Sequence, residues 1–256
     1  MKCIILAAGQ GSRLRPYTND RPKCMVPLSG KPLLYHQIEV LAKSNIALQD
    51  TALVCGYLQE ALVDLGFKRY ENLRFAETNM VTTLFCAAEF MERGHDLIVS
   101  YGDIVYEQGV LQKLIDTEGD IVIAADVAWE KLWSLRMAKP LDDAETFRID
   151  KDGFLYELGK KPGCEKEVEA QYMGLIKVKA DKVAAFKNFY YSLNQQSYYD
   201  GNDFDNMYMT SFLQCLIDDG WKLTPALVEE GWVEVDTVED LDVYEASGFF
   251  KSDNLK

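Results

Sequence analysis

The chain opens with an apolar run that ends abruptly in a loop with two glycines, Cys3-Ile4-Ile5-Leu6-Ala7-Ala8-Gly9-Gln10-Gly11-Ser12-Arg13. An uninterrupted apolar run of this length is typical of a buried strand. The glycines let the backbone that follows approach a ligand closely, and its exposed N–H groups can bind oxyanions. Arg13 and, ten residues later, Lys23 would neutralise phosphate charge. The segment predicts a strand that leads into a phosphate-binding loop.

Two glycines in a loop are, by themselves, more often a simple turn. The loop lacks the third glycine of the dinucleotide-binding fingerprint and the Gly-Lys-Ser/Thr of the P-loop. The phosphate interpretation therefore depends on a combination: the strand, the paired glycines, Arg13 and the dipeptide Pro22-Lys23.

This combination resembles the signature of the nucleotidyltransferases that join a nucleoside triphosphate to a phosphorylated small molecule. The signature runs Leu-Ala-Ala-Gly, any residue, Gly, any residue, Arg-Leu, then Pro-Lys, and residues 6–23 fill every position. The likeness spans most of the chain and points to the group of phosphocholine cytidylyltransferase, since no long C-terminal extension is seen. It implies the Rossmann-like fold of the sugar-1-phosphate nucleotidyltransferases.

The composition of the 256 residues, 48% hydrophobic and 27% charged, is ordinary for a soluble globular enzyme. No apolar run approaches the roughly 20 residues of a membrane helix, so no membrane insertion is expected. The six cysteines are scattered without a C-x-x-C pair, which argues against a zinc site or disulfide framework and predicts a cytoplasmic protein. A net charge of −14 disfavours nucleic acid as a partner. A monomer or homodimer is expected.

Strand and helix patterns alternate in the first half, which predicts an α/β fold with a doubly wound, mostly parallel sheet. The predicted strands are Lys2–Ala7, Thr51–Cys55, Leu73–Ala76, Asp96–Ser100, Asp120–Asp126 and Trp232–Val235. The predicted helices are Pro32–Lys43, Tyr57–Leu65, Thr82–Met91, Val110–Asp116, Asp181–Ser192, Met207–Asp218 and Val238–Ala246.

The pattern changes after about Trp129. Short strands near Phe147, at Phe154–Leu158 and at Gly174–Val178 predict a small inserted antiparallel region laid across the sheet. Residues 194–206 and the tail from Lys251 are predicted to be loose. We predict a single nucleotidyltransferase domain over residues 1–256, with an acceptor-binding insert at roughly 129–206.

Two aspartates follow predicted strands: Asp103 after Leu97-Ile98-Val99, and Asp236 after Trp232–Val235. Ligands of a doubly wound sheet bind beyond the carboxyl ends of its strands, and Mg²⁺ is commonly held by one or two carboxylates with phosphate oxygens and water. The usual role of such an aspartate is in a turn or cap, and Asp236 could cap the last helix. The resemblance favours Mg²⁺ binding, because relatives place metal-binding aspartates in a Gly-Asp and in a late Val-Asp.

The resemblance also implies the reaction: an acceptor phosphate oxygen attacks the α-phosphorus, and pyrophosphate leaves in line. Because this nucleophile is already anionic, catalysis depends on positioning and charge neutralisation, and His36 and His95 are expected to be structural or on the surface. Arg13 is expected at the β- and γ-phosphates and Lys23 at the α-phosphate. The predicted catalytic residues are Lys23, Arg13, Asp103 and Asp236, and the predicted nucleotide-binding residues are Leu6, Ala7, Ala8, Gly9, Gly11, Ser12, Arg13, Lys23, Asn79, Thr83 and Asp103.

The segment Glu77–Leu84 precedes a predicted helix and is expected to face the base. Asn79 offers both a donor and an acceptor for a base edge, although a helix cap is an equally good interpretation. In pyrimidine-using relatives a loop at this place reads the base. The resemblance predicts CTP, with UTP or dTTP as the alternatives.

Two cationic residues are candidates for binding the acceptor. Lys160 resembles the family lysine that meets the acceptor phosphate, although a solvated surface lysine looks the same in the sequence. Arg136 fits a choline headgroup poorly and could instead pair with a carboxylate of the acceptor.

Three aromatic residues, Trp129, Trp133 and Tyr172, could form a wall of the acceptor site. With Asp126 or Glu130 beside it, such a wall would hold a quaternary ammonium by cation–π attraction. Aromatic residues at this spacing are more often part of a core. The acceptor therefore stays open among phosphocholine, a phosphorylated amino acid such as phosphoglutamine, and an aminoalkyl phosphonate.

The predicted function is Mg²⁺-dependent transfer of CMP from CTP to such an acceptor, for the synthesis of cell-surface polysaccharide or phospholipid precursors. One alternative is a sugar-1-phosphate nucleotidyltransferase that uses UTP or dTTP. Another is a non-catalytic nucleotide sensor. A sensor has little need of Lys23 and of both aspartates, so their presence favours an enzyme.

Overall fold

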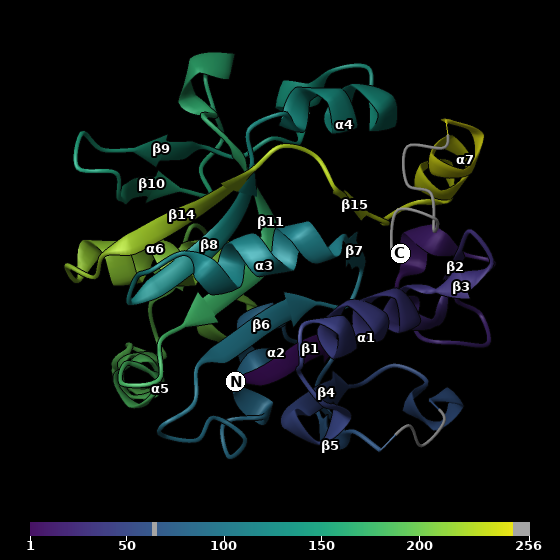
Figure 1. Ribbon diagram of the computed structural model, residues 1–256, viewed down its shortest axis with the longest axis horizontal. Helices are drawn as coiled ribbons and strands as arrows, with labels where there is room; N and C mark the ends of the chain where they lie inside the picture. Colours follow the sequence, from purple (N-terminus) through teal and green to yellow (C-terminus); the bar gives the residue numbers. More distant parts are fainter. Residues whose placement is uncertain (63–65, 248–256) are drawn as a thin grey trace.

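A seven-stranded sheet in the order β14-β8-β11-β6-β1-β4-β5 forms the centre of the computed structural model, which describes residues 1–62 and 66–247 (Figure 1). The neighbouring strands run parallel except β11, which is antiparallel to both β6 and β8. The strands are β1 Lys2–Ala7, β4 Thr51–Cys55, β5 Lys68–Glu71, β6 Leu97–Tyr101, β8 Ile121–Asp126, β11 Gln171–Val178 and β14 Leu223–Val228.

Strand β1 lies deep in the sheet, between β4 and β6. Ile4 pairs with Ala52 of β4 and Val99 of β6, and the three side chains are fully buried. A parallel strand that is covered on both faces needs apolar side chains in both directions, which explains the uninterrupted run at the start of the chain.

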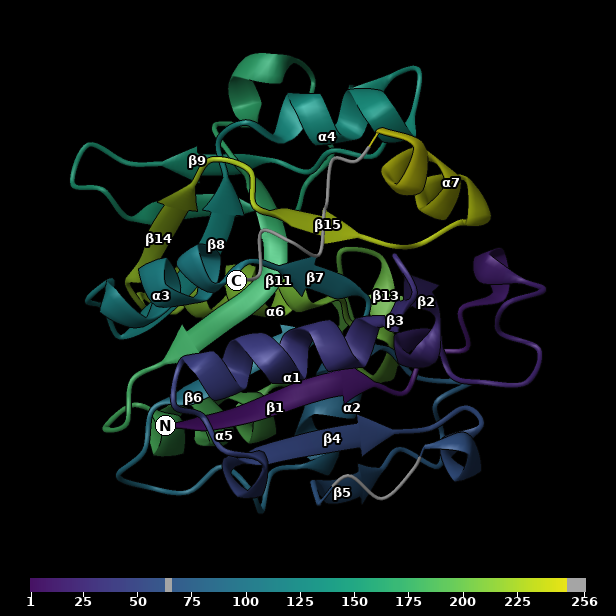
Figure 2. The same cartoon turned by 45° about the vertical axis from the view of Figure 1, so that its right-hand side comes forward.

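Helices cover both faces of the sheet (Figures 1 and 2). Cys3 and Ile5 of β1 face an apolar cluster that includes side chains of α1 and α3, whereas Ile4 and Leu6 face a second cluster with α2, α5 and α6. This alternation is the two-residue period of a strand, and it makes the fold a three-layered α/β/α arrangement. The helices are α1 Leu33–Lys43, α2 Met80–Cys86, α3 Gln108–Asp116, α4 Trp129–Arg136, α5 Val183–Ser192, α6 Met209–Asp218 and α7 Val238–Ser247.

Short strands form four further antiparallel pairs. The pair of β7 with β15 matters most, because it joins the segment after β6 to the segment before α7. The Val235 N–H donates to the Asp103 carbonyl at 3.0 Å, so the two predicted metal-binding aspartates are brought together by this pair. The short strands are β2 Pro27–Leu28, β3 Lys31–Pro32, β7 Ile104–Tyr106, β9 Phe147–Ile149, β10 Leu155–Leu158, β12 Tyr198–Tyr199, β13 Asn202–Asp203 and β15 Trp232–Glu234.

The predicted α/β fold with a mostly parallel sheet is confirmed, together with small antiparallel pairs outside it. The strands predicted at Lys2–Ala7 and Thr51–Cys55 have those bounds, and the helix predicted from Pro32 begins at Leu33. The strand predicted at Gly174–Val178 is part of β11. It is antiparallel as expected, but it lies within the central sheet instead of across it.

Two predicted elements are wrong. The helix expected at Tyr57–Leu65 is only a 3₁₀ turn, Gln59–Ala61, within the described residues, because Leu58 has a left-handed φ of 46°. Residues 63–65 of that prediction lie outside the described residues.

The strand expected at Leu73–Ala76 is instead β5, which ends at Glu71. The chain turns there because the Asn72 side-chain oxygen accepts a hydrogen bond from the Arg74 N–H at 3.0 Å. Leu73 is consequently 80% exposed and does not pack in the sheet.

Helix α4 and strand β14 were not predicted. The apolar residues of α4 have helical spacing over only two turns, too few to distinguish a helix from a loop. Strand β14 contains Pro225, which is tolerated because β14 is an edge strand. The segment 194–206, expected to be loose, contains the short β12–β13 pair, and the tail from Lys251 lies outside the described residues.

None of the helices among the described residues is long and apolar enough to cross a membrane. All six cysteines are free thiols in the structure.

Candidate functional site

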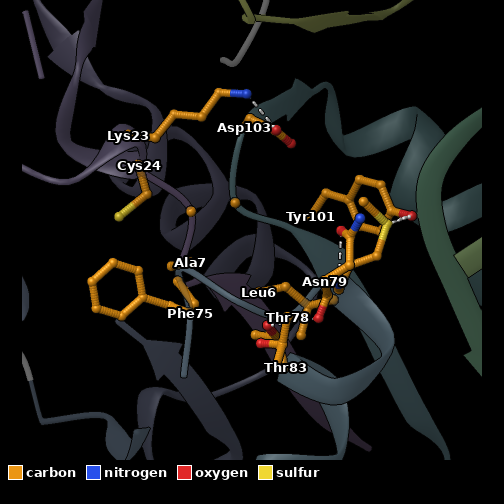
Figure 3. A pocket seen from close by; sticks show the side chains of 14 residues that line it. Leu6, Ala7, Lys23, Cys24, Phe75, Thr78, Asn79, Thr83, Tyr101 and Asp103 are labelled. Carbon is orange, nitrogen blue, oxygen red and sulfur yellow. Dashed lines mark hydrogen bonds and ion pairs between the residues drawn. The ribbon is translucent and has the colours of Figure 1, made fainter. Parts of the chain in front are cut away.

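Three cavities meet beyond the carboxyl ends of β1 and β6, where the loop after β1 approaches the start of α2. The first, called the Asn79 cavity, has a volume of about 140 Å³ (Figure 3). It is lined by Leu6, Ala7, Ala8, Gly9, Lys23, Cys24, Phe75, Thr78, Asn79, Met80, Thr83, Tyr101, Gly102 and Asp103.

The second, the Arg13 cavity, has a volume of about 210 Å³, and the third, the Tyr172 cavity, about 350 Å³. The Arg13 cavity is lined by Gly9, Gly11, Ser12, Arg13, Lys23, Asp103 and Asp236. The Tyr172 cavity is lined by Arg13, Met80, Tyr101, Trp133, Asp143, Glu145, Gln171, Tyr172, Met173, Gly174, Tyr208, Met209, Thr210, Trp232, Glu234 and Asp236.

The three cavities share walls and form one continuous cleft. Lys23 and Asp103 line both the Asn79 and the Arg13 cavities. Arg13 and Asp236 line both the Arg13 and the Tyr172 cavities. A ligand that extends from one end of the cleft to the other therefore passes the charged groups at its centre.

The loop after β1 has its shape because of Gly11, whose φ is +59°. A side chain there would be strained, and its Cβ would lie 3.0 Å from the Thr18 side chain and 3.1 Å from that of Lys23. The Thr18 hydroxyl donates to the Gly11 carbonyl at 2.8 Å and holds the loop against Lys23. Arg13 follows in a 3₁₀ turn, with its side chain 67% exposed and free to reach a ligand.

Gly102 allows the end of β6 to lie against the end of β1. Its N–H donates to the Leu6 carbonyl at 2.9 Å, and a Cβ at this position would be only 2.5 Å from that oxygen. Any other residue would push the two strand ends apart, and would move Asp103 away from the loop after β1.

Lys23 lies at the centre of the cleft between two carboxylates. Its ammonium is 2.6 Å from Asp103 Oδ2 and also forms a short ion pair with Asp236 Oδ1 (Figure 3 shows the Asp103 pair). Burial by itself lowers the pKa of Lys23, but the two carboxylates outweigh burial and raise the pKa above its ordinary value. Lys23 is therefore charged throughout the neutral pH range.

Residues at the start of α7 fix the position of Asp236 beside the cleft. Thr237 and Asp240 form a capping box: the Asp240 N–H donates to the Thr237 hydroxyl at 3.1 Å, and the Thr237 N–H to the Asp240 carboxylate at 2.9 Å. The Asp236 N–H donates to the same carboxylate at 2.8 Å. Asp236 is thus not the cap of the helix, and its own carboxylate pairs with Lys23 and, at 3.3 Å, with Arg13.

Glu234 is a third carboxylate at this place. Carboxylate oxygens of Asp103, Glu234 and Asp236 lie within 4.8 Å of one another. Burial and the nearby Asp236 raise the pKa of Glu234 to about 8, against the opposing effect of Arg136. The buried Asp103 Oδ1 has no hydrogen-bond partner among the described residues. Three oxygen ligands that repel one another, one of them unpartnered, fit the donor set of a divalent cation such as Mg²⁺.

Asn79 is a helix cap, which is one of the two roles that the sequence left open. Its side-chain oxygen accepts from the Met80 N–H at 2.8 Å and caps α2, and the residue also lines the Asn79 cavity. Its amide nitrogen is left to donate to a ligand. The Thr83 hydroxyl is engaged with Asn72 Nδ2 at 2.9 Å and with the Asn79 carbonyl at 3.1 Å, so Thr83 can only shape the wall.

The structure brings the predicted nucleotide-binding residues together. All eleven line the Asn79 cavity, the Arg13 cavity or both. Sequence reasoning did not single out Cys24, Phe75 and Tyr101, which also line the Asn79 cavity. Gly102, Thr78 and Met80 line it too, and Gly102 belongs to the predicted Gly-Asp strand end that contains Asp103. Thr78 and Met80 belong to the segment expected to face the base, whereas nothing in the sequence pairs Phe75 with that segment.

The predicted acceptor-binding residues divide into two groups. Tyr172 and Trp133 line the Tyr172 cavity. Trp129 does not: it is 2% exposed, and its indole N–H donates to the Val168 carbonyl at 3.2 Å. Lys160 does not line the Tyr172 cavity either, since its ammonium lies 3.5 Å from Glu157.

Arg136 differs most from its expected role. Its side chain is only 4% exposed, and it pairs with Glu234 at 2.9 Å, Asp240 at 3.0 Å and Asp236 at 3.5 Å. Arg136 therefore pairs with carboxylates of the protein itself, and not with a carboxylate of the acceptor as expected. Asp126, which was considered beside the aromatic wall, is also occupied. Its carboxylate accepts a hydrogen bond from the Trp232 indole N–H at 3.0 Å.

Several residues of the Tyr172 cavity were missed. The polar ones are Asp143, Glu145, Tyr208, Thr210 and Glu234, whereas Gln171 belongs to the segment 171–174 that was considered for the acceptor. Glu234 lies two residues before Asp236, which was a usable signal. Glu145 and Thr210 come from distant parts of the chain, and no local pattern connects them.

Comparisons with known proteins agree with this geometry. Residues 3–152 match the family described as MobA-like NTP transferase domain. The chain is 43% identical over 253 residues to CTP:phosphoglutamine cytidylyltransferase of Campylobacter jejuni subsp. jejuni serotype O:2, covering 95% of this chain and 98% of that protein. It is 31% identical over 163 residues to CMP-5'-(3-aminopropyl)phosphonate synthase of Streptomyces rubellomurinus, which covers 60% of this chain and 24% of that protein.

A solved structure of CTP:phosphocholine cytidylyltransferase from Streptococcus pneumoniae has the same fold, with a TM-score of 0.73 and 22% sequence identity, covering 96% of this chain and 98% of that one. The family match includes the loop after β1, Lys23 and Asp103, which lie together at the centre of the cleft. The chain belongs to the nucleotidyltransferase family that the MobA-like NTP transferase domain defines.

Proposed function

We propose that the protein is a cytidylyltransferase that transfers CMP from CTP to phosphoglutamine, or to an acceptor of the same chemical class, and releases pyrophosphate. The observation that carries this proposal is the 43% identity to a CTP:phosphoglutamine cytidylyltransferase over nearly the whole of both chains. The continuous cleft supports it, because it offers separate places for a base, a triphosphate and an acceptor.

In the proposed reaction an acceptor phosphate oxygen forms a bond to the α-phosphorus of CTP. The bond between the α-phosphorus and the bridging oxygen to the β-phosphate breaks, and pyrophosphate leaves with that electron pair. No proton has to be removed from the nucleophile. The residues therefore need only align the two phosphates and neutralise their charge.

Lys23 and Arg13 suit these two tasks. Lys23 lines both the Asn79 and the Arg13 cavities, which supports a role at the α-phosphate of a nucleotide whose base would lie in the Asn79 cavity. The exposed Arg13 side chain can reach the β- and γ-phosphates and steady the leaving group.

A divalent cation, Mg²⁺, would be held by Asp103 and Asp236, with Glu234 as a third ligand. When bound, the ion supplies positive charge that offsets the repulsion between the two phosphates and the carboxylates. The chain itself contributes the orientation of these ligands, through Gly102 for Asp103 and through the Asp240 carboxylate for Asp236.

The acceptor site lies in the Tyr172 cavity. Part of its lining comes from residues 129–206, as expected of an acceptor-binding insert in a single domain. The rest comes from Arg13, from the start of α2 and the end of β6, from the start of α6, and from β15 and its loop. Met80 and Tyr101 separate this cavity from the Asn79 cavity, so the base and the acceptor would lie on either side of them.

The proposal is tested by pyrophosphate release with each nucleotide in turn, in Mg²⁺, against phosphoglutamine, phosphocholine, 2-aminoethylphosphonate and glucose-1-phosphate. We expect the highest kcat/KM for CTP with phosphoglutamine. Faster turnover of UTP or dTTP with the sugar phosphate would instead identify a sugar-1-phosphate nucleotidyltransferase. Tight binding of nucleotide without turnover of any acceptor would identify a sensor.

A further inference from the structure

The Tyr172 cavity has an unusual balance of charge. Arg13 is the only lysine or arginine in its lining, at the end next to the Arg13 cavity, against four carboxylates. Two of these are neutralised within the protein, since Glu234 pairs with Arg136 and Asp236 with Lys23. The other two are Asp143 and Glu145.

Asp143 and Glu145 have no lysine or arginine partner in the described part of the chain. Glu145 is half-buried, beside Thr210, and its backbone N–H contacts the Gln171 side-chain oxygen at 3.4 Å. Burial, followed by the nearby Asp143 and Asp200, raises the pKa of Glu145 to about 7. A carboxylate in such a place is destabilised until a cation binds beside it.

A second polar group of the same cavity is also unsatisfied. The indole nitrogen of Trp133 is buried, in a side chain that is 2% exposed, and it has no hydrogen-bond partner among the described residues. An indole N–H can only donate, so an oxygen of a ligand would satisfy it. Among the described residues, the cavity thus offers neither a lysine or arginine to Asp143 and Glu145 nor a hydrogen-bond acceptor to the Trp133 indole.

We propose that Glu145, with Asp143 beside it, binds the ammonium group of the acceptor and so selects zwitterionic phospho-amines over sugar phosphates. The inference rests on the proposed function for the position of the acceptor phosphate, next to Lys23 and the α-phosphate of CTP. An amino-acid acceptor has the required features: an anionic phosphate for that end, an ammonium for Glu145 and a carboxylate that can accept from Trp133. A sugar offers no cation to either carboxylate.

The test combines two acceptors with three variants. The acceptors are phosphoglutamine and its desamino counterpart, which keeps the phosphate and the carboxylate but lacks the ammonium. The variants are Glu145→Gln, Asp143→Asn and, as the matched control, Glu118→Gln, an exposed residue that precedes β8 at the opposite end of the sheet. KM and kcat are measured with CTP fixed at saturation.

We expect Glu145→Gln to raise the KM for phosphoglutamine by roughly 30-fold or more, as when one partner of a desolvated charge pair is removed. We expect kcat to change little, and the KM for the desamino compound to be the same in the wild type and in Glu145→Gln. Asp143→Asn should have a smaller effect in the same direction. An equal loss with both acceptors, or no loss with either, would overturn the assignment.

Calorimetric titration with phosphoglutamine in the absence of nucleotide separates this inference from the proposed function. Binding that the wild type shows and Glu145→Gln loses supports the ammonium site even if no cytidylyl transfer occurs. Turnover of phosphoglutamine with unchanged binding in Glu145→Gln would leave the proposed function standing and refute the site.

Discussion

Lys23 is the residue on which the rate should depend most. We expect Lys23→Met to lower kcat by about 100- to 1000-fold, because the ammonium acts on charge that develops at the α-phosphate. The measurement is pyrophosphate release at saturating CTP and acceptor. Lys113→Met, an exposed lysine of α3, is the control and should keep the wild-type rate. A rate within a few-fold of wild type in Lys23→Met would show that another cation has this role.

Glu145 should make acceptor binding depend on pH. Its pKa is raised to about 7, by burial first and by Asp143 and Asp200 next, so it is mostly neutral below that pH and mostly charged above it. Because an ammonium binds the charged form, the KM for phosphoglutamine should fall as the pH rises through about 7. Glu145→Gln should not show this fall in KM. The ionisation of the acceptor phosphate affects both proteins alike, so the difference between the KM–pH profiles of the wild type and the variant reports Glu145 alone. Parallel profiles would contradict the prediction.

At the scale of elements, Arg136 connects α4 to β15 and α7. Its nearly buried guanidinium pairs with Glu234, Asp236 and Asp240 and lies 5.1 Å from the Trp133 ring centre. Arg136→Met would leave those carboxylates without their shared cation. We expect the free energy of unfolding to fall by about 3–5 kcal/mol in urea denaturation, the range for breaking a buried ion pair.

Lys131→Met is the matched control for Arg136→Met, because Lys131 is on the same helix but 61% exposed in its ion pair with Glu230. Exposed pairs contribute about 0–1 kcal/mol, so this variant should be close to wild type. Equal losses in the two variants would mean that Arg136 acts through helix packing and not through its charge. Arg136→Lys, which keeps the charge, should recover part of the loss.

At the scale of the whole molecule, ligands of the cleft should stabilise the fold. A ligand that binds only the folded state at 100 times its Kd adds about 2.7 kcal/mol, which raises the Tm of a chain of this size by about 5–10 °C. We expect this rise with CTP and Mg²⁺ and a smaller one with UTP. Chelation of Mg²⁺ should remove most of it, and Asp103→Asn should behave like the chelated wild type. A rise that does not depend on the metal would contradict the assignment of the three carboxylates.

Much of the nucleotide side could be predicted from the sequence, because it is built from neighbouring residues. The strand Lys2–Ala7, the loop with Gly11 and the residues Arg13 and Lys23 lie within one segment, and the strand pattern itself places them at the edge of the sheet. Asp103 and Asp236 were found by the same reasoning, since each follows a strand or strand pair. The resemblance to a known signature then identified the chemistry.

The acceptor side shows what sequence alone does not decide. Arg136, Trp129 and Trp133 lie in one helix and all three side chains are buried. Only the tertiary fold decides that the first pairs with Glu234, that the second donates to the Val168 carbonyl and that the third lines the Tyr172 cavity. Hydrophobic spacing indicates that a face is buried but not against which partner.

The sequence by itself determined the fold class, the first strand with the loop and the two cationic residues that follow it, and the aspartates at the ends of two strands. Each of these depends on residues that are close together in the chain. Only the tertiary structure decided that Glu234 joins the two aspartates, that Arg136 pairs with these carboxylates from another helix, and that Glu145 lines the Tyr172 cavity with no lysine or arginine partner in the described part of the chain. The physical reason is that burial and the pairing of charges depend on which distant segments the fold brings together, and these contacts leave no local pattern in the sequence.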